Sequence, residues 1–456
     1  MRLGLLSARC GLTLLGPERD LPLMIRVDSR DVSAGDGFVA LRGEHVDGRR
    51  FIPDVLAKGA SLVVCEKAAY LPEWNARFPQ VSFLLTEGRC EYGLALLASE
   101  YLKTLAQLKE FIAVTGSVGK TSTKNYARAF LEERFKLHCA GGNYNTLIGC
   151  AVTMLAAPSD TEVLLFEMGA NHKGEIAEMV RFMPPTIAAI TEVTPVHVEG
   201  FGSLEGVLAA KSEILSSSAL RLAVINGDNA MLCHAVDSMK LPSVLRFGRT
   251  GGVAFERERL SWTDGHFQVD AVLTGLDGIS FNLSLPLSGI HQLYPLCCAC
   301  AISESLGLST REIALSVAKC RSGAGRGEIR QALGGAAIVD ECYNASPAAM
   351  KASLASMNAV EIEGRRFLIL GEMRELGPAA KEEHEKLLRR ALSVGGELFL
   401  YGGEWDSVEG AAPYCFGSLE ELVSAVEALK PGKGDVILVK GSRGNHLEQV
   451  VKALEL

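Results

Sequence analysis

The chain has 456 residues, a length that exceeds what one hydrophobic core organises and indicates two to four domains. Hydrophobic residues make up 48% and charged residues 22%, as in soluble globular proteins, while 47 glycines and only 6% aromatic residues favour α/β architecture. The net charge of −8, with no basic stripe along the sequence, argues against a nucleic-acid-binding function. Small anionic substrates stay possible, because single lysines and arginines are enough to bind them.

The twelve cysteines and the apolar stretches bear on the cellular compartment. Only Cys297 and Cys300 form a C-x-x-C pair, and no second pair completes a zinc site. Both lie in 293–308, which is typical of a buried helix, so we expect reduced core thiols in a cytoplasmic protein. Residues 1–16 lack a signal-peptide cleavage site, and the longest uncharged run, 279–303, contains two prolines. We therefore expect no membrane span.

The predicted elements alternate between strands and helices along most of the chain. A helical pattern covers 90–108, and βαβ alternation from 109 onward predicts a mostly parallel sheet with helices on both faces. Residues 252–286 instead alternate like antiparallel hairpins, which indicates a β insertion or flap. The βαβ alternation then resumes after residue 318 and predicts a second open sheet. We therefore predict three α/β domains at about 1–103, 104–318 and 319–456. The expected strands cover 24–32, 35–41, 61–66, 81–87, 109–115, 162–169, 187–193, 221–228, 245–249, 336–343, 366–373, 397–404 and 435–442.

The segment "VTGSVGKTS" (114–122) lies between an expected strand and an expected helix. In a P-loop, a glycine-rich turn at this place lets backbone amides bind phosphate oxygens at a helix N-terminus. Val114 stands where the usual pattern has its first glycine, and Thr115-Gly116 replaces that entry. The alternative is an ordinary strand–turn–helix corner. The Gly-Lys-Thr in register favours nucleotide binding, with Lys120 on the terminal phosphates and Thr121 on Mg²⁺.

Three further residues stand in unusual surroundings. Glu167 ends an apolar run and is placed like the carboxylate that holds a metal in P-loop enzymes, although a glutamate at a strand end is often only solvated. His197 lies on a loop after an expected strand, and Lys211 follows on a helix among small and apolar residues. Taken singly, such a histidine is usually structural and such a lysine solvated. A buried lysine, however, has a lowered pKa, and its neutral amine becomes available for covalent chemistry.

The loop resembles that of the Mur ligase family, whose pattern T-G-[ST]-x-G-K-[ST] accounts for Thr115-Gly116. Successive motifs of the family are resembled in order by "GNYNTLIG" (142–149), "EMGANHKGEI" (167–176), "VHVEGFGS" (196–203) and "AAKSEI" (209–214). The D-alanyl-D-alanine-adding branch is resembled by "GRGEI" (325–329), "VDECYNASP" (339–347), "LGEMRELG" (370–377) with His384, and "ILVKGSRGNHLE" (437–448). Residues 28–51 resemble the uridine-nucleotide-binding segment of that branch, so the similarity covers nearly the whole chain.

The resemblance implies an ATP-dependent ligase of peptidoglycan precursor synthesis, which joins D-Ala-D-Ala to UDP-MurNAc-tripeptide through an acyl phosphate. It implies two Mg²⁺ ions held by Thr121, Glu167, His197 and Lys211, with Lys211 carbamylated by CO₂; Lys120, Glu167, His197 and Lys211 form the catalytic set. By the same resemblance, the ATP phosphates are bound by Gly116, Ser117, Val118, Gly119, Lys120, Thr121 and Ser122. The nucleotide is also bound from the third domain, by Arg326 with Asp340 or Glu341. The resemblance assigns the UDP to Ser29, Arg30, Asp47 and Gly48, and the sugar-peptide to Asn143, Asn145 and Thr146.

The resemblance also implies that the C-terminal domain closes over the central one to exclude water, which would hydrolyse the acyl phosphate. We expect a monomer. Some positions depart from the family: "GIHQLYP" (289–295) has Gln292 and Pro295 in place of two asparagines that approach the nucleotide, and Glu341 and Ser346 replace Asp and Asn. None of the four belongs to the metal set, so we expect an active enzyme.

Four other classes of protein share parts of this sequence pattern. A sister ligase that adds the third amino acid normally carries a D-N-P-R-like motif, which this sequence lacks. The uridine segment at 28–51 argues against a folylpolyglutamate synthase, and a GTP switch needs an N-K-x-D signature that is not present. The last is a nucleotide-binding protein without ligase activity. The third residue of the tripeptide, diaminopimelate or lysine, and the base that takes the proton of the incoming amine stay open.

Overall fold

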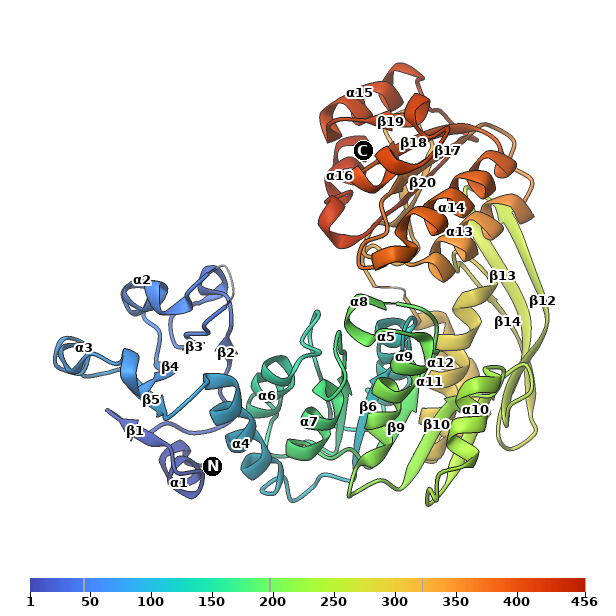
Figure 1. The fold of residues 1–456 in the computed structure, drawn as a ribbon. Helices are drawn as coiled ribbons and strands as arrows, with labels where there is room; N and C mark the ends of the chain where they lie inside the picture. The colour runs from blue at the N-terminus through green and yellow to red at the C-terminus, as the bar shows by residue number, and fades with distance from the viewer. Residues whose placement is uncertain (44–45, 197, 322, 456) are drawn as a thin grey trace.

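Three separate β-sheets organise the chain, and helices flank each of them (Figure 1). The computed structural model describes residues 1–43, 46–196, 198–321 and 323–455. The sheets draw on residues 13–86, 110–285 and 328–440, and the second lies between the first and the third in space (Figure 1). The α/β architecture with mostly parallel sheets, expected from the sequence, is confirmed.

The first sheet has the strand order β1-β5-β4-β3-β2, in which only β1 is antiparallel to its neighbour. Alternate residues of β4 point to opposite faces, as strand geometry requires. Leu62 and Val64 pack with α4, and Val63 and Cys65 pack with α2. The elements are α1 (Leu3–Arg9), β1 (Thr13–Leu15), β2 (Ile25–Arg26), β3 (Gly37–Val39), α2 (Ile52–Ala57), β4 (Leu62–Glu66), α3 (Pro72–Arg77), β5 (Ser82–Thr86) and α4 (Cys90–Leu102).

The central sheet has nine strands in the order β14-β13-β12-β11-β10-β9-β6-β8-β7. Its pairs are parallel from β7 to the start of β12 and antiparallel beyond, so the predicted β insertion continues the sheet. The strands are β6 (Glu110–Thr115), β7 (Leu137–Cys139), β8 (Val163–Glu167), β9 (Ile187–Ile190), β10 (Leu222–Asn226), β11 (Val244–Gly248), β12 (Val253–Thr263), β13 (His266–Thr274) and β14 (Ser280–Leu285). The helices are α5 (Lys120–Leu131), α6 (Leu147–Leu155), α7 (Glu175–Phe182), α8 (Val198–Phe201), α9 (Leu204–Ser212), α10 (Ala230–Asp237), α11 (Leu293–Ser305) and α12 (Thr310–Ser316).

The third sheet has the order β15-β16-β20-β17-β18-β19, and only β15 is antiparallel. Helices α13 and α14 cover one face, and α15 and α16 cover the other. The elements are β15 (Glu328–Gln331), β16 (Ala337–Glu341), α13 (Pro347–Ala359), β17 (Arg366–Gly371), α14 (Ala380–Val394), β18 (Glu397–Tyr401), β19 (Cys415–Phe416), α15 (Leu419–Ala428), β20 (Val436–Lys440) and α16 (Glu448–Leu454).

The hairpin of β12 and β13 reaches from the central sheet to the third domain (Figure 1). Its root belongs to the central core, where Phe255 and its cross-strand neighbour Leu273 are buried. Its tip packs Phe267, and beside it Trp262, into the core under α13. Between root and tip the register of β12 shifts, and Arg257 has φ +54°, a bulge that bends the strand.

Helix α11 confirms the expected buried helix at the C-x-x-C pair, because its Cys297, Cys298 and Cys300 are fully buried thiols without disulfides. Their apolar surroundings raise the pKa of each thiol well above its usual value. None of the helices in the described parts of the chain is long and apolar enough to span a bilayer.

Candidate active site

The loop between β6 and α5 is held against the end of β9. Gly116 has φ +144° and Gly119 has φ +85°, conformations that favour glycine, and a side chain on Gly116 would collide with the Thr191 hydroxyl. The amide of Ser117 donates to Glu192 O at 2.8 Å. Lys120 begins α5 and donates from Nζ to Gly116 O at 2.8 Å, so its ammonium lies within the curve of the loop. The geometry is that of a phosphate-binding loop.

Glu167 ends the neighbouring strand β8 and meets the loop helix directly. Its Oε2 accepts a hydrogen bond from Thr121 Oγ1 at 2.7 Å, and its Oε1 accepts one from Asn145 Nδ2 at 3.0 Å. Burial acts to raise the pKa of Glu167, which is 2% exposed, but the charge of Lys120 and the two hydrogen bonds outweigh it and leave the pKa below its usual value. Glu167 is therefore an ionised carboxylate in a nearly dry site.

Lys211, near the end of α9, is buried beside the segment that follows β8. It is 1% exposed, donates from Nζ to Ala170 O at 3.1 Å, and lies 5.0 Å from the centre of the Phe201 ring. Burial, together with the charge of Lys120, lowers the Lys211 pKa to about 7. His197, predicted as its companion, lies outside the described residues. Across the described residues, no three His, Cys, Asp or Glu side chains converge as ready metal ligands.

The segment with Asn143, Asn145 and Thr146 borders this cluster, but the three side chains differ in role. Asn145 contacts Glu167, whereas Thr146 is the N-cap of α6 and accepts from Gly149 N. Lys124, which the sequence interpretation missed, is buried in α5 and donates to Ala140 O at 2.9 Å. It fixes the start of this segment against the loop helix. A lysine one turn after the Gly-Lys-Thr was the only signal for it in the sequence.

Arg326 of the third domain reaches the loop. Its positive charge contributes to the lowered pKa of Lys120, after burial, and its guanidinium lies 3.9 Å from the centre of the Tyr343 ring. Gln292 links the two domains, because its Nε2 donates to Arg326 O at 3.3 Å and its Oε1 accepts from Tyr126 Oη at 3.4 Å. The departure from the family pattern at Gln292 thus serves a contact between domains.

Two of the other three departures, Pro295 and Ser346, also have local roles. Pro295 lies in α11 beside Gly119, 3.5 Å from where a side chain of that glycine would begin, so it packs on the phosphate loop. Ser346 is the N-cap of α13 and accepts from Ala349 N at 3.4 Å. Serine and asparagine are equally good N-caps, so this exchange keeps the helix start.

Asp340 and Glu341, the two acidic candidates of β16, point to opposite faces of the sheet. Asp340 lies 3.3 Å from Arg330 Nε, on the edge strand β15, away from the loop. Glu341 is buried beside Lys440, with 3.1 Å between its Oε2 and Nζ, and it accepts from Ser353 Oγ. The charge of His291 in the central domain also acts on Glu341. Glu341 is therefore the acidic residue that faces the central domain.

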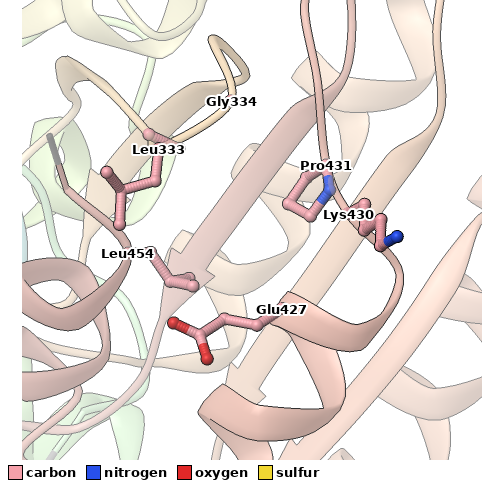
Figure 2. A pocket seen from close by; sticks show the side chains of 7 residues that line it. Leu333, Gly334, Glu427, Lys430, Pro431 and Leu454 are labelled. Atoms are coloured by element: carbon pink, nitrogen blue, oxygen red, sulfur yellow. The ribbon is translucent and has the colours of Figure 1, made fainter.

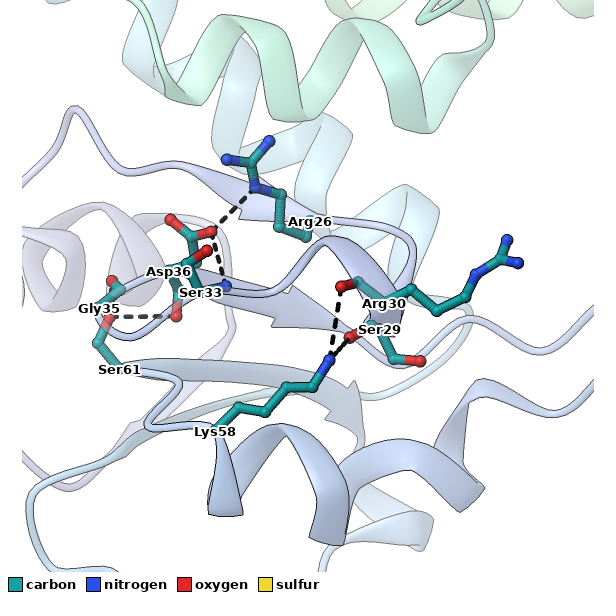
Figure 3. Close-up of polar contacts among 8 residues, drawn as sticks. All are labelled: Arg26, Ser29, Arg30, Ser33, Gly35, Asp36, Lys58 and Ser61. Carbon is teal, nitrogen blue, oxygen red and sulfur yellow. Dashed lines mark hydrogen bonds and ion pairs between the residues drawn. The ribbon is translucent and has the colours of Figure 1, made fainter.

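The four residues expected to bind UDP lie in the first domain, on two short turns. Lys58 Nζ donates to Ser29 O at 2.8 Å (Figure 3). The exposed Arg30 pairs with Asp28. Asp47 accepts from Arg49 N at 3.0 Å and caps the turn that begins at Gly48. A side chain on Gly48 would lie 2.6 Å from Leu41 O, so only glycine fits there.

A phosphate-binding loop, a buried carboxylate on the next strand and an arginine from a separate sheet define a three-domain P-loop nucleotide-dependent α/β protein. Family models match accordingly: the Mur ligase family catalytic domain at 23–85, the Mur ligase middle domain at 114–303, and the Mur ligase glutamate ligase domain at 325–443. The chain belongs to the Mur ligase family.

Similar proteins span the whole chain. The UDP-N-acetylmuramoyl-tripeptide–D-alanyl-D-alanine ligases of Rickettsia prowazekii and Bacillus subtilis are 30% and 29% identical to it. The matches cover 94% of both chains for Rickettsia, and 97% of this chain and 95% of the other for Bacillus. The MurF ligase from Thermotoga maritima in complex with ADP is 28% identical, with a TM-score of 0.79 over 95% of this chain and 98% of that one. MurF from Acinetobacter baumannii, 24% identical, shares the fold with a TM-score of 0.82 over 98% of this chain and 97% of that one.

Proposed function

We propose that this protein is an ATP-dependent ligase that joins D-Ala-D-Ala to UDP-MurNAc-tripeptide in peptidoglycan precursor synthesis. The observation that carries the proposal is the contact of Thr121 and Glu167 beside Lys120, which combines a metal-binding pair with a phosphate-binding lysine. Relatives with the name of that activity align along more than nine tenths of the chain. We also propose the division into a UDP-binding domain (1–103), an ATP-binding domain (104–318) and a C-terminal ligase domain (319–456).

ATP is the proposed phosphate donor, bound by the loop amides of Gly116 to Ser122 and by Lys120, with Arg326 on the nucleotide from the third domain. The ADP complex of the Thermotoga relative supports this assignment. The peptide carboxylate attacks the γ-phosphorus of ATP, the bond to the β–γ bridging oxygen breaks and ADP leaves. Because two anions must approach each other in this step, Lys120 acts by reducing their repulsion. The amine of the dipeptide then displaces phosphate from the acyl phosphate through a tetrahedral intermediate.

The residues at the end of β8 fit a magnesium site. Thr121 offers a hydroxyl and Glu167 an ionised carboxylate, both oxygen donors of the kind that Mg²⁺ prefers. We propose that Lys211 becomes carbamylated, which would replace a buried amine by a third oxygen ligand, and that His197 completes a second ion site. When bound, Mg²⁺ neutralises charge on the transferred phosphoryl group. The burial of Lys211 and its pKa of about 7 support carbamylation, because CO₂ reacts with the neutral amine.

The test is phosphate release from ATP in the presence of UDP-MurNAc-tripeptide, with and without D-Ala-D-Ala. Release that requires both substrates, together with a pentapeptide product identified by mass, is the expected result. Turnover of UDP-MurNAc-dipeptide with a diamino acid, and none with D-Ala-D-Ala, would transfer the assignment to the sister ligase. Running both substrate forms, with diaminopimelate and with lysine as the third residue, also identifies the natural tripeptide.

A further inference from the structure

The loop at 372–377, after β17, faces the active site from the third domain. It lies at the carboxyl ends of β17 and β20, the edge where open α/β sheets bind ligands. Gly377 touches α8, since a side chain there would begin 3.2 Å from Glu199 Cγ, and the Phe201 ring of α8 lies 5.0 Å from Lys211 Nζ. The loop is rigid where it begins, because Met373 N donates to Nε2 of the buried His384 at 3.0 Å.

Arg374 of this loop has a fixed position and free donors. Its amide donates to Ser442 Oγ at 3.0 Å, and its Nε donates to Glu372 Oε1 at 2.6 Å. The guanidinium lies against Gly444, where a Cβ would begin 2.1 Å from Nη1. Within the described part of the chain, neither Nη1 nor Nη2 has a hydrogen-bond partner, and the side chain is 52% exposed. A guanidinium held through Nε presents these nitrogens as a fork that matches a carboxylate.

Asn445, next to Gly444, is a second polar side chain at this edge of the sheet without hydrogen-bond partners among the described residues. It is 3% exposed, and both Nδ2 and Oδ1 are buried without a hydrogen-bond partner among the described residues. Buried polar groups are rarely left unpaired, because the hydrogen bonds to water that they lose on burial are not replaced. The amide lies between the ends of β17 and β20, against Gly371 and Gly441. The Asn445 amide therefore leaves one donor and one acceptor unpaired at the carboxyl edge of the sheet, next to the glycine on which the Arg374 guanidinium lies.

A cavity on the same domain offers a contrast. It measures about 320 Å³ and is lined by Leu333, Gly334 and Leu454 with the turn around Pro431 (Figure 2). It lies at the amino ends of β16 and β20, on the opposite edge of the sheet from Arg374. Its charged lining residues are Glu427 and Lys430, and among the described residues it contains no guanidinium that could form a bidentate pair with a carboxylate.

We propose that Arg374 binds the terminal carboxylate of the incoming dipeptide, with Asn445 as a supporting donor at the same edge of the sheet. The inference rests on the proposed function and adds the group that recognises the amine substrate. The loop lies between two groups of residues: Arg443, which is 5.5 Å from the Tyr343 ring, and α8, whose Phe201 ring is 5.0 Å from Lys211 Nζ. The first group belongs to the proposed nucleotide site and the second to the proposed metal site. A dipeptide held at Arg374 by its carboxylate directs its free amine toward the acyl phosphate between these two sites.

The experiment compares D-Ala-D-Ala with its C-terminal amide in the wild type, Arg374→Met and Arg374→Lys. We expect Arg374→Met to raise the KM for D-Ala-D-Ala by roughly 10- to 100-fold, the scale of a charge-assisted bidentate pair. The KM values for ATP and UDP-MurNAc-tripeptide should change by less than about twofold, because the affected contact touches neither. The wild type should discriminate against the amide, and Arg374→Met should not. Arg374→Lys should fall between them, because a lysine keeps the charge without the fork.

Arg389→Met, at an exposed position of α14, is the matched control and should behave like the wild type. Unchanged discrimination in Arg374→Met, alongside normal turnover in the wild type, would overturn the inference and leave the proposed function standing. A raised KM for ATP with an unchanged KM for the dipeptide would also overturn it, and would assign the guanidinium to the nucleotide phosphates. Absence of wild-type turnover with this substrate pair would overturn the proposed function and the inference together.

Discussion

The hydroxyl of Thr121 donates a 2.7 Å hydrogen bond to Oε2 of Glu167, across 46 positions of sequence. The contact joins the first turn of α5 to the end of β8, so the phosphate loop and the carboxylate are held as one unit. Both oxygens are also the expected ligands of one metal ion, and the hydrogen bond keeps them close together before the ion binds. The site is thus preorganised by contacts within the central domain alone.

Replacing Glu167 by glutamine should abolish metal-dependent turnover. The amide keeps the shape and one acceptor oxygen but removes the charge, and we expect kcat to fall by about 100- to 1,000-fold. The measurement is phosphate release over a magnesium titration. Glu162→Gln, just before the same strand and paired with Lys109, is the control and should keep full activity. Similar activity in the two variants would remove Glu167 from the metal site.

Carbamylation of Lys211 should depend on CO₂ and on pH. The pKa of about 7, against 10.5 for an ordinary lysine, means that the neutral amine grows in as the pH rises through 7. We expect a carbamate carbon signal by NMR after incubation with isotopically labelled bicarbonate, and lower activity in buffer freed of CO₂. Lys211→Ala should lack the signal and the activity. A fully active Lys211→Arg would contradict the proposal, because arginine is permanently charged.

The buried pair of Glu341 and Lys440 should make stability depend on pH at the acid end. Burial acts to raise the Glu341 pKa, but Lys440, His291 and two serine hydroxyls lower it from 4.5 to about 2. Because the folded-state pKa is the lower one, the stabilisation is full above about pH 4.5 and is lost as the pH falls toward 2. The shift corresponds to at most about 3 kcal/mol.

Urea unfolding of wild type and Glu341→Gln, between about pH 7 and about pH 3, checks this prediction. The variant should be less stable near neutrality, and the difference should shrink with acid. Glu397→Gln, at an exposed position of β18 in the same sheet, is the control. A constant difference across the range would mean that the charge of Glu341 is not what stabilises the pair.

Gln292→Asn should weaken the approach of Arg326 to the loop. Asparagine is one methylene shorter and cannot span the distance between Tyr126 and the Arg326 carbonyl that Gln292 bridges. We expect the KM for ATP to rise by about 3- to 10-fold, the scale of one or two hydrogen bonds. Gln268→Asn on β13 makes the same chemical change at a surface hydrogen bond and should have no effect. An unchanged KM would show that Arg326 is positioned by other contacts.

The sequence was informative wherever function depends on neighbours in the chain. The strand, loop and helix around Lys120 and the position of Glu167 at a strand end were predicted from local pattern. Short edge strands such as β1 and β7 were missed, because three residues carry too little periodicity.

Contacts between distant segments could not be predicted in the same way. Whether Asp340 or Glu341 faces the central domain depends on which face of β16 that domain covers, and this is decided by packing. The bridge from Gln292 to Arg326 joins two domains, so the family asparagine pattern gave no indication of it. The free donors of Arg374 likewise became visible only when the fold placed Gly444 beneath its guanidinium.

The hairpin of β12 and β13 has a mechanical consequence. Since Phe267 belongs to the core of the third domain, that domain cannot swing toward the phosphate loop on its linker alone. The third domain must either move together with the hairpin tip or lose the packing of the buried Phe267 ring. The hairpin therefore acts as a tether, a connection of fixed length between the two domains. The bulge at Arg257 is the point at which this connection can bend. Such a tether restricts the third domain to an arc instead of free rotation.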